Sequence, residues 1–303
     1  MRWLSWTFLI PGLFLLCCSP GAQARETRYQ APLSPGYHQD LNEAGVAYDL
    51  YIPEPKNSAE PKEKNQLSYR LLLVLPGWKF DKSRWMKETE LKKFADEHSM
   101  ILVLPQMNTS IYASSYFPET RMKWNPVPGL KYINEKLLPG LREKYGFFLP
   151  GKQNYLLGLS TGGRGVALIA LSNPGLFRAG ASFSGDYDKS VMPTDKLMAA
   201  VYGPFEKFGR RWRETDNPVQ AASSLQTPLY LSHGTADHVV PPDQTRRFYD
   251  AIQKSRSENG QNAGNDKDIA VELNMVPGAG HDFSFWNQQL RPAFAFFKKY
   301  FHE

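Results

Sequence analysis

The sequence is poor in cysteine, in long apolar runs and in clustered charge. Of its 303 residues only two are cysteines, Cys17 and Cys18, and both lie within the first 24 residues. Past that point no apolar run approaches the roughly 20 residues that a membrane-spanning helix needs, and no internal repeat is visible. These absences exclude a disulfide framework downstream of the first 24 residues, a multi-span membrane protein and a repeat array.

The charge pattern argues against a nucleic-acid partner. The 36 Lys and Arg residues exceed the 30 Asp and Glu residues, which gives a net charge of +6, but the basic residues are scattered. Nucleic-acid binding requires them to gather in a stripe or patch. With 42% hydrophobic and 22% charged residues, the composition is typical of a soluble globular protein. One short run, Arg210, Arg211 and Arg213, could meet an acidic substrate, although such runs more often form a solvated face.

The N-terminus has the pattern of a secretory signal peptide. Arg2 precedes a short apolar stretch, and Ala22-Gln23-Ala24 supplies the small residues at which a signal peptidase cuts. We therefore expect residues 1–24 to be a signal peptide and residues 25–303 to form a single secreted or periplasmic domain. An uncleaved anchor and a lipoprotein are the alternatives, which the shortness of the apolar stretch and the leucine before the first cysteine disfavour.

Downstream, short apolar runs alternate with helical patterns, which is typical of an α/β fold. Because runs such as Leu71-Leu72-Leu73-Val74 are apolar throughout, we expect strands buried on both faces of a mostly parallel sheet flanked by helices. The predicted strands are residues 47–52, 70–75, 100–105, 154–159, 179–184, 228–232 and 270–276. The predicted helices are residues 85–98, 130–145, 162–172, 242–254 and 291–301.

Three connections between these elements are long. Residues 53–68 are rich in Pro, Lys, Glu and Asn, and we interpret them as a solvated hairpin loop. Residues 108–128 and 189–224 contain aromatic and helical patterns of their own. Since long loops at the carboxyl ends of parallel strands form ligand sites, we interpret both as pocket walls or as pieces of a small cap. The alternative is that they only cover the edges of the sheet.

The segment Gly158-Leu159-Ser160-Thr161-Gly162 has the G-x-S-x-G pattern of a nucleophile elbow. It directly follows the predicted strand 154–159 and opens the predicted helix 162–172, which is the context that the motif requires. In such a turn the serine adopts a strained conformation, and the glycines on either side avoid collisions with neighbouring backbone. We therefore predict that Ser160 presents its hydroxyl above the sheet as a nucleophile.

A serine hydroxyl is a poor nucleophile at neutral pH and needs a histidine base with an acid to orient it. Asp237 follows the predicted strand 228–232, and His281 follows the predicted strand 270–276, in the chain order Ser, Asp, His. Because the carboxyl ends of parallel strands meet at one edge of a sheet, we expect Ser160, Asp237 and His281 to converge there.

Alternatives exist for both partners of the serine. His238 competes with His281 as the base, and Asp186 or Asp188, which follow the predicted strand 179–184, compete with Asp237 as the acid. The histidines and aspartates show no spacing typical of metal ligands. We therefore expect neither a metal nor another cofactor.

Two backbone N–H groups should stabilise the oxyanion that forms in acyl transfer. The first predicted donor is Thr161, because its N–H lies at the N-terminus of the helix that follows Ser160. The second is Trp78, in the loop after the predicted strand 70–75. Aromatic residues of the long loops and of the His281 loop are candidates for an acyl or aryl pocket, with core packing as the alternative: Trp124, Tyr187, Phe283 and Trp286.

With these motifs in place, the chain resembles the α/β-hydrolase superfamily over nearly all of residues 25–303. The stretch Gly158–Gly185, with Asn173-Pro174-Gly175-Leu176-Phe177 and Ser182-Phe183-Ser184-Gly185, is similar to the putative esterase (esterase D-like) family. One departure is Pro76-Gly77, where many members have His-Gly.

That family includes S-formylglutathione hydrolase, feruloyl and short-chain acyl esterases and mycolyltransferases. The resemblance implies an α/β-hydrolase catalytic domain with loop or small cap insertions. It further implies a serine carboxylic-ester hydrolase whose triad positions are matched by Ser160, Asp237 and His281. The fold also hosts acyltransferases, peptidases, polyester depolymerases and non-catalytic binding proteins, so the substrate stays open between small-molecule and polymeric esters.

Overall fold

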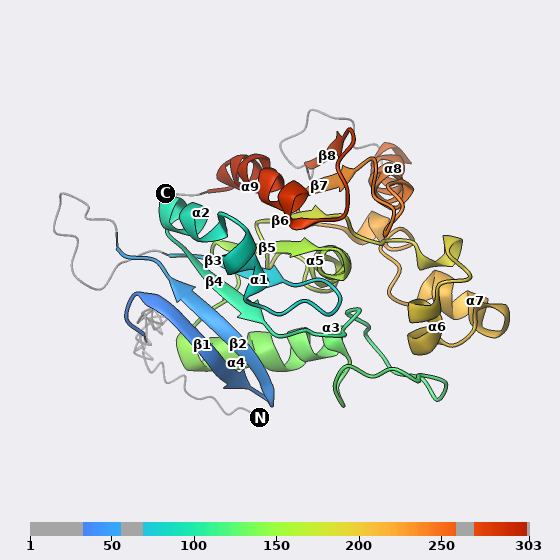
Figure 1. Ribbon diagram of the computed structural model, residues 1–303, viewed down its shortest axis with the longest axis horizontal. Coiled ribbons are helices and arrows are strands. Elements are labelled where there is room, and N and C mark those ends of the chain that lie inside the picture. The colour runs from blue at the N-terminus through green and yellow to red at the C-terminus, as the bar shows by residue number, and fades with distance from the viewer. Residues whose placement is uncertain (1–32, 56–68, 259–269, 302–303) are drawn as a thin grey trace, which may run out of the picture.

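The computed structural model describes residues 33–55, 69–258 and 270–301, so the predicted signal peptide lies outside the described residues. An eight-stranded sheet runs through the molecule in the order β1-β2-β4-β3-β5-β6-β7-β8 (Figure 1). β2 pairs antiparallel with β1 and β4, and the other neighbouring pairs are parallel, which confirms the mostly parallel sheet. The strands are β1 (Gly36–Glu43), β2 (Val46–Ile52), β3 (Arg70–Leu75), β4 (Met100–Pro105), β5 (Asn154–Leu159), β6 (Ala179–Phe183), β7 (Leu229–Gly234) and β8 (Val271–Val276).

Helices cover both faces of the sheet, as the sequence predicted. The α-helices are α1 (Arg84–Glu88), α2 (Leu91–His98), α3 (Gly129–Tyr132), α4 (Leu138–Tyr145), α5 (Thr161–Ser172), α6 (Lys196–Tyr202), α7 (Phe205–Glu214), α8 (Asp243–Glu258) and α9 (Phe283–Lys298). The π-helical turn η1 (Ile133–Leu137) joins α3 to α4, and η2 (Lys189–Val191) and η3 (Ala222–Ser224) are 3₁₀ turns. Within the described ranges, no helix is both long enough and apolar enough to span a bilayer.

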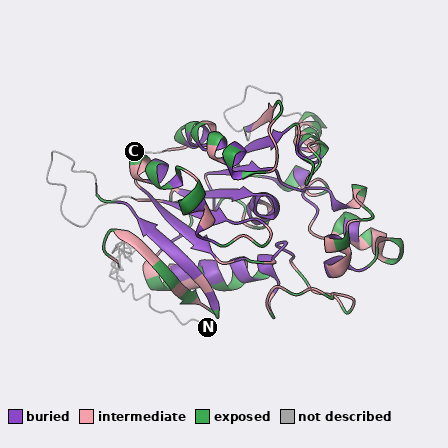
Figure 2. Ribbon diagram, in the orientation of Figure 1, coloured by how far each residue is buried: buried purple, intermediate pink, exposed green. Residues whose placement is uncertain are grey.

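The core has two layers, one on each face of the sheet. On β3, Leu71 and Leu73 belong to the apolar cluster that includes residues of α4, α5 and α8, whereas Leu72 and Val74 belong to the cluster that includes residues of α1, α2 and α9. This alternation follows from the two-residue repeat of a strand. Figure 2 shows the central strands buried and the outer surfaces of the helices exposed. Burial on both faces explains why the strand sequences are apolar throughout.

Three expectations about the elements are wrong. The connection from β2 to β3 is not a hairpin, because β2 pairs with β1 and β4 and not with β3; most of the predicted loop 53–68 lies outside the described residues. The hairpin is β1–β2, and β1 was not predicted. The single helix predicted over 85–98 divides into α1 and α2, because Thr89 adopts an extended conformation between them. The last helix begins at Phe283 rather than near residue 291, since the Asp282 side chain caps it by accepting a hydrogen bond from the Phe285 N–H.

The two long excursions, residues 108–128 and 189–224, pack against each other, and we call them together the cap. The Thr120 hydroxyl donates to the Val201 carbonyl at 2.6 Å, and the Arg121 N–H donates to the Ala200 carbonyl at 2.7 Å. The cap has its own apolar cluster, formed by Ile111, Ala113, Met198, Val201, Tyr202 and Trp212. Its helices α6 and α7 lie beyond the carboxyl ends of the parallel strands, at the right of Figure 1.

Candidate active site

Ser160 lies at the sharp turn between β5 and α5, with backbone angles φ 55° and ψ −126°. Positive φ is rare for a residue with a side chain, and it indicates a strained turn. Glycine is required on both sides. A Cβ on Gly158 would lie 2.3 Å from the Gly162 carbonyl oxygen, and a Cβ on Gly162 would lie 2.4 Å from the Leu75 carbonyl oxygen. The local sequence therefore folds into the elbow that its pattern predicted.

The structure places His281 and Asp237 in a hydrogen-bonded chain with Ser160. His281 Nε2 lies 3.0 Å from Ser160 Oγ, and His281 Nδ1 lies 2.6 Å from Asp237 Oδ2. Because a carboxylate only accepts hydrogen bonds, Nδ1 carries the hydrogen, which leaves Nε2 free to accept the serine proton. The other carboxylate oxygen, Oδ1, accepts the N–H groups of Val239 at 2.9 Å and Val240 at 2.8 Å.

Asp237 is held as a carboxylate in a buried position. Burial alone would raise the pKa of Asp237, but hydrogen bonds from His233, His281 and the Val240 N–H hold it well below its ordinary value. The side chain has no exposed surface, whereas that of His281 is 9% exposed. A permanently ionised acid beside Nδ1 keeps the imidazole in one tautomer and favours its protonated form when Nε2 takes a proton.

The alternative partners lie elsewhere. His238 is exposed and has no role in this hydrogen-bonded chain. Asp186 is buried 3.5 Å from Arg164 Nη1, and burial raises its pKa. The Asp188 carboxylate accepts hydrogen bonds from Ser190 and Asn217. In the part of the chain that the structure describes, no three His, Cys, Asp or Glu side chains are grouped so that they could hold a metal ion.

The two backbone N–H groups predicted as oxyanion donors belong to Thr161, which directly follows Ser160, and to Trp78. Thr161 is the first residue of α5, so its N–H has no acceptor within the helix. The Trp78 N–H has no hydrogen-bond acceptor among the residues that the structure describes. Gly77, directly before it, lies so close to the serine that a Cβ there would be 3.1 Å from Ser160 Cβ. This close approach brings the β3–α1 loop to the nucleophile.

The four aromatic candidates for the pocket have different surroundings. Tyr187 is fully buried, stacks on Phe248 at 4.7 Å and hydrogen-bonds to Ser182, so it belongs to the core. Phe283 and Trp286 are also buried and pack edge to face at 4.9 Å.

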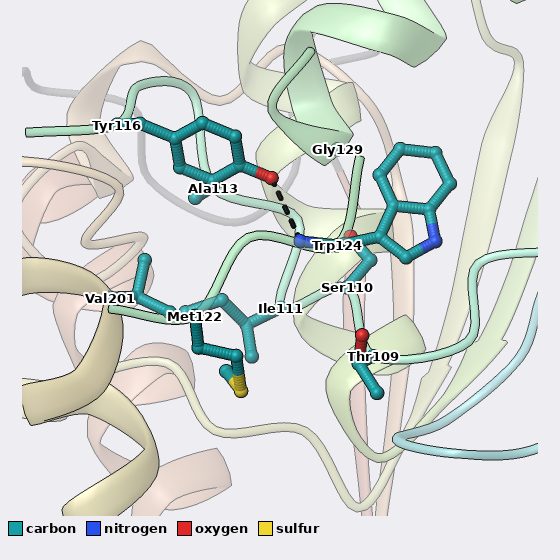
Figure 3. A pocket seen from close by; sticks show the side chains of 9 residues that line it. All are labelled: Thr109, Ser110, Ile111, Ala113, Tyr116, Met122, Trp124, Gly129 and Val201. Atoms are coloured by element: carbon teal, nitrogen blue, oxygen red, sulfur yellow. Dashed lines mark hydrogen bonds between the residues drawn. The ribbon is translucent and has the colours of Figure 1, made fainter. Parts of the chain in front are cut away.

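Trp124 is half-buried and lines a cavity of about 10 Å³ inside the cap, room for about one water molecule (Figure 3). There its backbone N–H donates a hydrogen bond to the Tyr116 hydroxyl at 3.1 Å. A substrate contact for these four residues stays a prediction. In the structure Tyr187, Phe283 and Trp286 are buried and pack in the core.

Two contacts of the site were not predicted. The Trp286 ring packs perpendicular to the His281 ring at 5.0 Å, and its indole N–H donates to Ser184 Oγ at 3.2 Å. His233, a fully buried residue of β7, contacts the Asp237 carboxylate. The sequence signal for His233 is its position, because a histidine in an otherwise apolar buried strand needs hydrogen-bond partners, and Asp237 follows four residues later.

The short basic run lies on α7 in the cap. Arg210 is exposed and pairs with Glu214, while Arg211 pairs with Glu119 at 2.9 Å and lies over the Phe117 ring. Arg210 thus lies on a solvated face, as expected for such a run, whereas the guanidinium of Arg211 is held inside the cap by these contacts.

Comparison with known proteins gives one family and several distant relatives. A family model described as "Putative esterase" matches residues 48–297. An isoprenylcysteine alpha-carbonyl methylesterase of Arabidopsis thaliana is 43% identical over 49 residues, which are 16% of this chain and 12% of that protein. A probable methylesterase of the same description and plant is 30% identical over 87 residues, 29% of this chain and 18% of that protein. The chain thus spans less than a fifth of the curated relatives it matches.

Solved structures resemble the whole fold at low identity. One is FphF, a fluorophosphonate-binding serine hydrolase of Staphylococcus aureus, with a TM-score of 0.63 and 18% identity over 87% of this chain and 99% of that chain. Another is an S-formylglutathione hydrolase from Agrobacterium tumefaciens, with a TM-score of 0.63 and 16% identity over 88% of this chain and 95% of that chain. At identities this low, the structural similarity shows that the fold is shared and shows nothing further.

Proposed function

The chain belongs to the putative esterase family, within the α/β-hydrolase superfamily that its sequence resembles, and from that premise we propose that it hydrolyses carboxylic esters through an acyl-enzyme on Ser160. The observation that carries the proposal is the chain from Ser160 Oγ to His281 Nε2 at 3.0 Å and from His281 Nδ1 to Asp237 Oδ2 at 2.6 Å. Both distances allow proton transfer without rearrangement.

In the first half-reaction Ser160 Oγ attacks the ester carbonyl carbon while its proton moves to His281 Nε2. The carbonyl oxygen becomes an oxyanion, for which the N–H groups of Thr161 and Trp78 are the proposed donors. Asp237 stabilises the imidazolium. As the carbon–oxygen bond of the ester breaks, His281 returns the proton to the leaving alkoxide, and the acyl group remains on the serine.

In the second half-reaction water replaces the alcohol. His281 Nε2 takes a proton from the water, whose oxygen attacks the acyl carbon, and the second tetrahedral intermediate collapses to the carboxylic acid. The proton returns to Ser160 Oγ, so the enzyme is regenerated. None of these steps requires a cofactor.

Hydrolysis of a p-nitrophenyl ester series, from acetate to a long acyl chain, tests the proposal on residues 25–303. Ser160→Ala is expected to lose about 10³-fold or more in kcat, because the acyl-enzyme can no longer form. The matched control is Ser223→Ala, an exposed serine of η3, which should match the parent. A folded parent that hydrolyses no ester, or a Ser160→Ala variant as active as the parent, would contradict the proposal. Transfer of the acyl group to an added alcohol in preference to water, or cleavage of the matching amide, would redirect it to acyl transfer or peptide hydrolysis.

The proposal includes export to the periplasm or the medium after removal of residues 1–24. Support comes from the apolar stretch that follows Arg2 and from the cleavage pattern Ala22-Gln23-Ala24. N-terminal sequencing of the exported full-length chain should begin at Arg25. Protein retained in the cytoplasm with Met1 intact would contradict export without touching the esterase proposal.

A further inference from the structure

A second imidazole contacts the acid of the site. His233 Nε2 lies 3.1 Å from Asp237 Oδ2, the same oxygen that receives the His281 Nδ1–H at 2.6 Å. His233 is the penultimate residue of β7, and its side chain has no exposed surface. The buried carboxylate oxygen is therefore shared by two histidines that come from different elements.

The partners of His233 fix its tautomer. Besides Asp237 Oδ2, Nε2 faces the Val240 carbonyl oxygen at 3.0 Å. Both oxygens only accept hydrogen bonds, so Nε2 must carry the hydrogen. Nδ1 then accepts from the Thr245 hydroxyl, which lies 2.6 Å away at the start of α8. His233 is thus the Nε2–H tautomer, hydrogen-bonded to the Val240 carbonyl and 3.1 Å from Asp237 Oδ2, whereas His281 is the Nδ1–H tautomer and donates to that same oxygen.

Resting on the proposed function, we infer that His233 is a positioning residue for the acid of the triad. Its Nε2–H fixes the orientation of the Asp237 carboxylate and disperses part of the negative charge that faces His281. Without this donor the full charge of Asp237 would act on His281, and the imidazolium formed within each half-reaction would return its proton less readily. A general base works best when its pKa lies near the operating pH. A carboxylate whose charge is partly dispersed by His233 therefore favours both uptake and release of the proton by His281.

The groups around Asp237 are few. His233 faces it from β7 and His281 from the β8–α9 loop, and the Val239 and Val240 N–H groups complete its contacts. The loop after β6 packs against α8, and its ionisable residues are Asp186, Tyr187 and Asp188. Burial raises the pKa of the Tyr187 hydroxyl, so this group stays neutral. The other ionisable residues of these loops and of the first turns of α8 are exposed, where solvent screens them: His238, Asp243, Arg246, Arg247 and Asp282.

The test compares His233→Leu with His233→Gln, whose side-chain amide can still donate to Asp237. In His233→Leu we expect kcat to fall about 10- to 100-fold, with KM little changed, because a hydrogen bond to a charged group is lost. The acidic limb of the kcat/KM profile should move to higher pH by about 0.5 pH unit, since the unmoderated carboxylate favours protonated His281. His233→Gln should recover part of the rate and return the limb toward the parent.

Thr245→Val supplies a second variant that removes the donor to His233 Nδ1 without opening a cavity at the strand. Thr245→Val should move the acidic limb of the kcat/KM profile to higher pH, by less than His233→Leu does. Folded sites are counted in each variant by labelling the serine with a fluorophosphonate probe. If Ser160→Ala abolishes activity but His233→Leu keeps the parent's kcat and acidic limb, the inference fails alone. A lower kcat with an unmoved limb in both His233→Leu and Thr245→Val assigns His233 a merely structural role and also overturns it. An inactive parent overturns the proposed function instead.

Discussion

The edge of the sheet that holds the proposed triad and the cap are both built from loops, but different forces hold them. At the edge, Ser160, Asp237 and His281 each follow a parallel strand within a few residues, so the register of β5, β7 and β8 fixes where each side chain lies. The cap is formed by longer excursions, and its conformation depends on its own apolar cluster and on buried cations. Short loops on a rigid sheet therefore hold the proposed triad, whereas the long excursions are stabilised by packing among their own residues.

The junction between the two regions is charged and buried. Arg164, in the first turns of α5, donates to the Tyr202 hydroxyl at 3.0 Å and to the Asp216 carbonyl at 2.8 Å, and Lys189 also donates to cap carbonyls. Burial lowers the pKa of Lys189. Trp78 packs on the apolar cluster of the cap while its backbone lies near the nucleophile. Trp78 and Arg164 are thus two of the residues through which the cap contacts the edge that holds Ser160.

The largest expected effect belongs to the cap. Trp212 on α7 is fully buried, packs edge to face on Phe205 at 5.4 Å and donates its indole N–H to the Gly203 carbonyl at 2.8 Å. Trp212→Ala should lower the free energy of unfolding by about 3–5 kcal/mol, because it leaves a cavity that the short helices cannot fill. Urea unfolding measures this, and kcat for p-nitrophenyl acetate, counted per folded molecule, should change little.

Trp212→Phe is the matched control, since it keeps the ring contact and loses only the indole donor. Its destabilisation should be clearly smaller. If kcat on the acetate ester fell in step with stability in Trp212→Ala, the cap would be part of the reacting machinery, and the division between the two regions would not hold.

A substitution at the edge should lower kcat strongly and change the free energy of unfolding little, the reverse of Trp212→Ala. A Cβ on Gly77 would lie 2.8 Å from Leu159 Cδ1 and 3.1 Å from Ser160 Cβ, so Gly77→Ala pushes the Trp78 N–H away from the nucleophile. Since the loss of one oxyanion donor costs about 10²- to 10³-fold in kcat, we expect a fall of about 10²-fold with little change in KM. The free energy of unfolding should change less than in Trp212→Ala, because the added methyl group leaves no cavity.

Gly209→Ala, on α7 in the cap, provides the comparison. Its Cβ would meet nothing closer than 3.5 Å, so activity should be kept and the helix slightly stabilised. A Gly77→Ala enzyme that keeps the parent's kcat would remove Trp78 as an oxyanion donor.

The sequence predicted the edge better than the cap for a physical reason. Gly158, Ser160 and Gly162 form a local pattern whose conformation is set by backbone sterics, and the strand before it can be recognised from its apolar run. The contacts of Tyr187 with Ser182 and Phe248 could not be predicted, because they join residues from three elements. The missed strand β1 is a half-exposed edge strand without an apolar run. The placement of α6 and α7 depends on the buried Arg164, which local patterns do not reveal.

Two buried carboxylates sharpen the comparison through opposite dependence on pH. At the edge, hydrogen bonds hold the pKa of Asp237 well below its ordinary value, although burial opposes them; near the cap junction, burial raises the pKa of Asp186 despite Arg164. A lowered pKa stabilises the folded state above the ordinary carboxyl pKa of about 4, and this contribution is lost as the pH falls below it. A raised carboxyl pKa destabilises the folded state at neutral pH, and this cost is relieved as the pH falls, because the folded state binds the proton more readily than the unfolded chain.

Urea unfolding of the parent, Asp237→Asn and Asp186→Asn between pH 7 and pH 3 separates the two. The stability advantage of the parent over Asp237→Asn should shrink on acidification from pH 7 to pH 3, by about 1 kcal/mol. Relative to Asp186→Asn, the parent should instead gain stability as the pH falls, by a smaller amount because Arg164 lies 3.5 Å away. Parallel curves for the two variants would mean that both carboxylates titrate alike, and that the hydrogen bonds from His233 and His281 do not distinguish the acid of the edge from a merely buried aspartate.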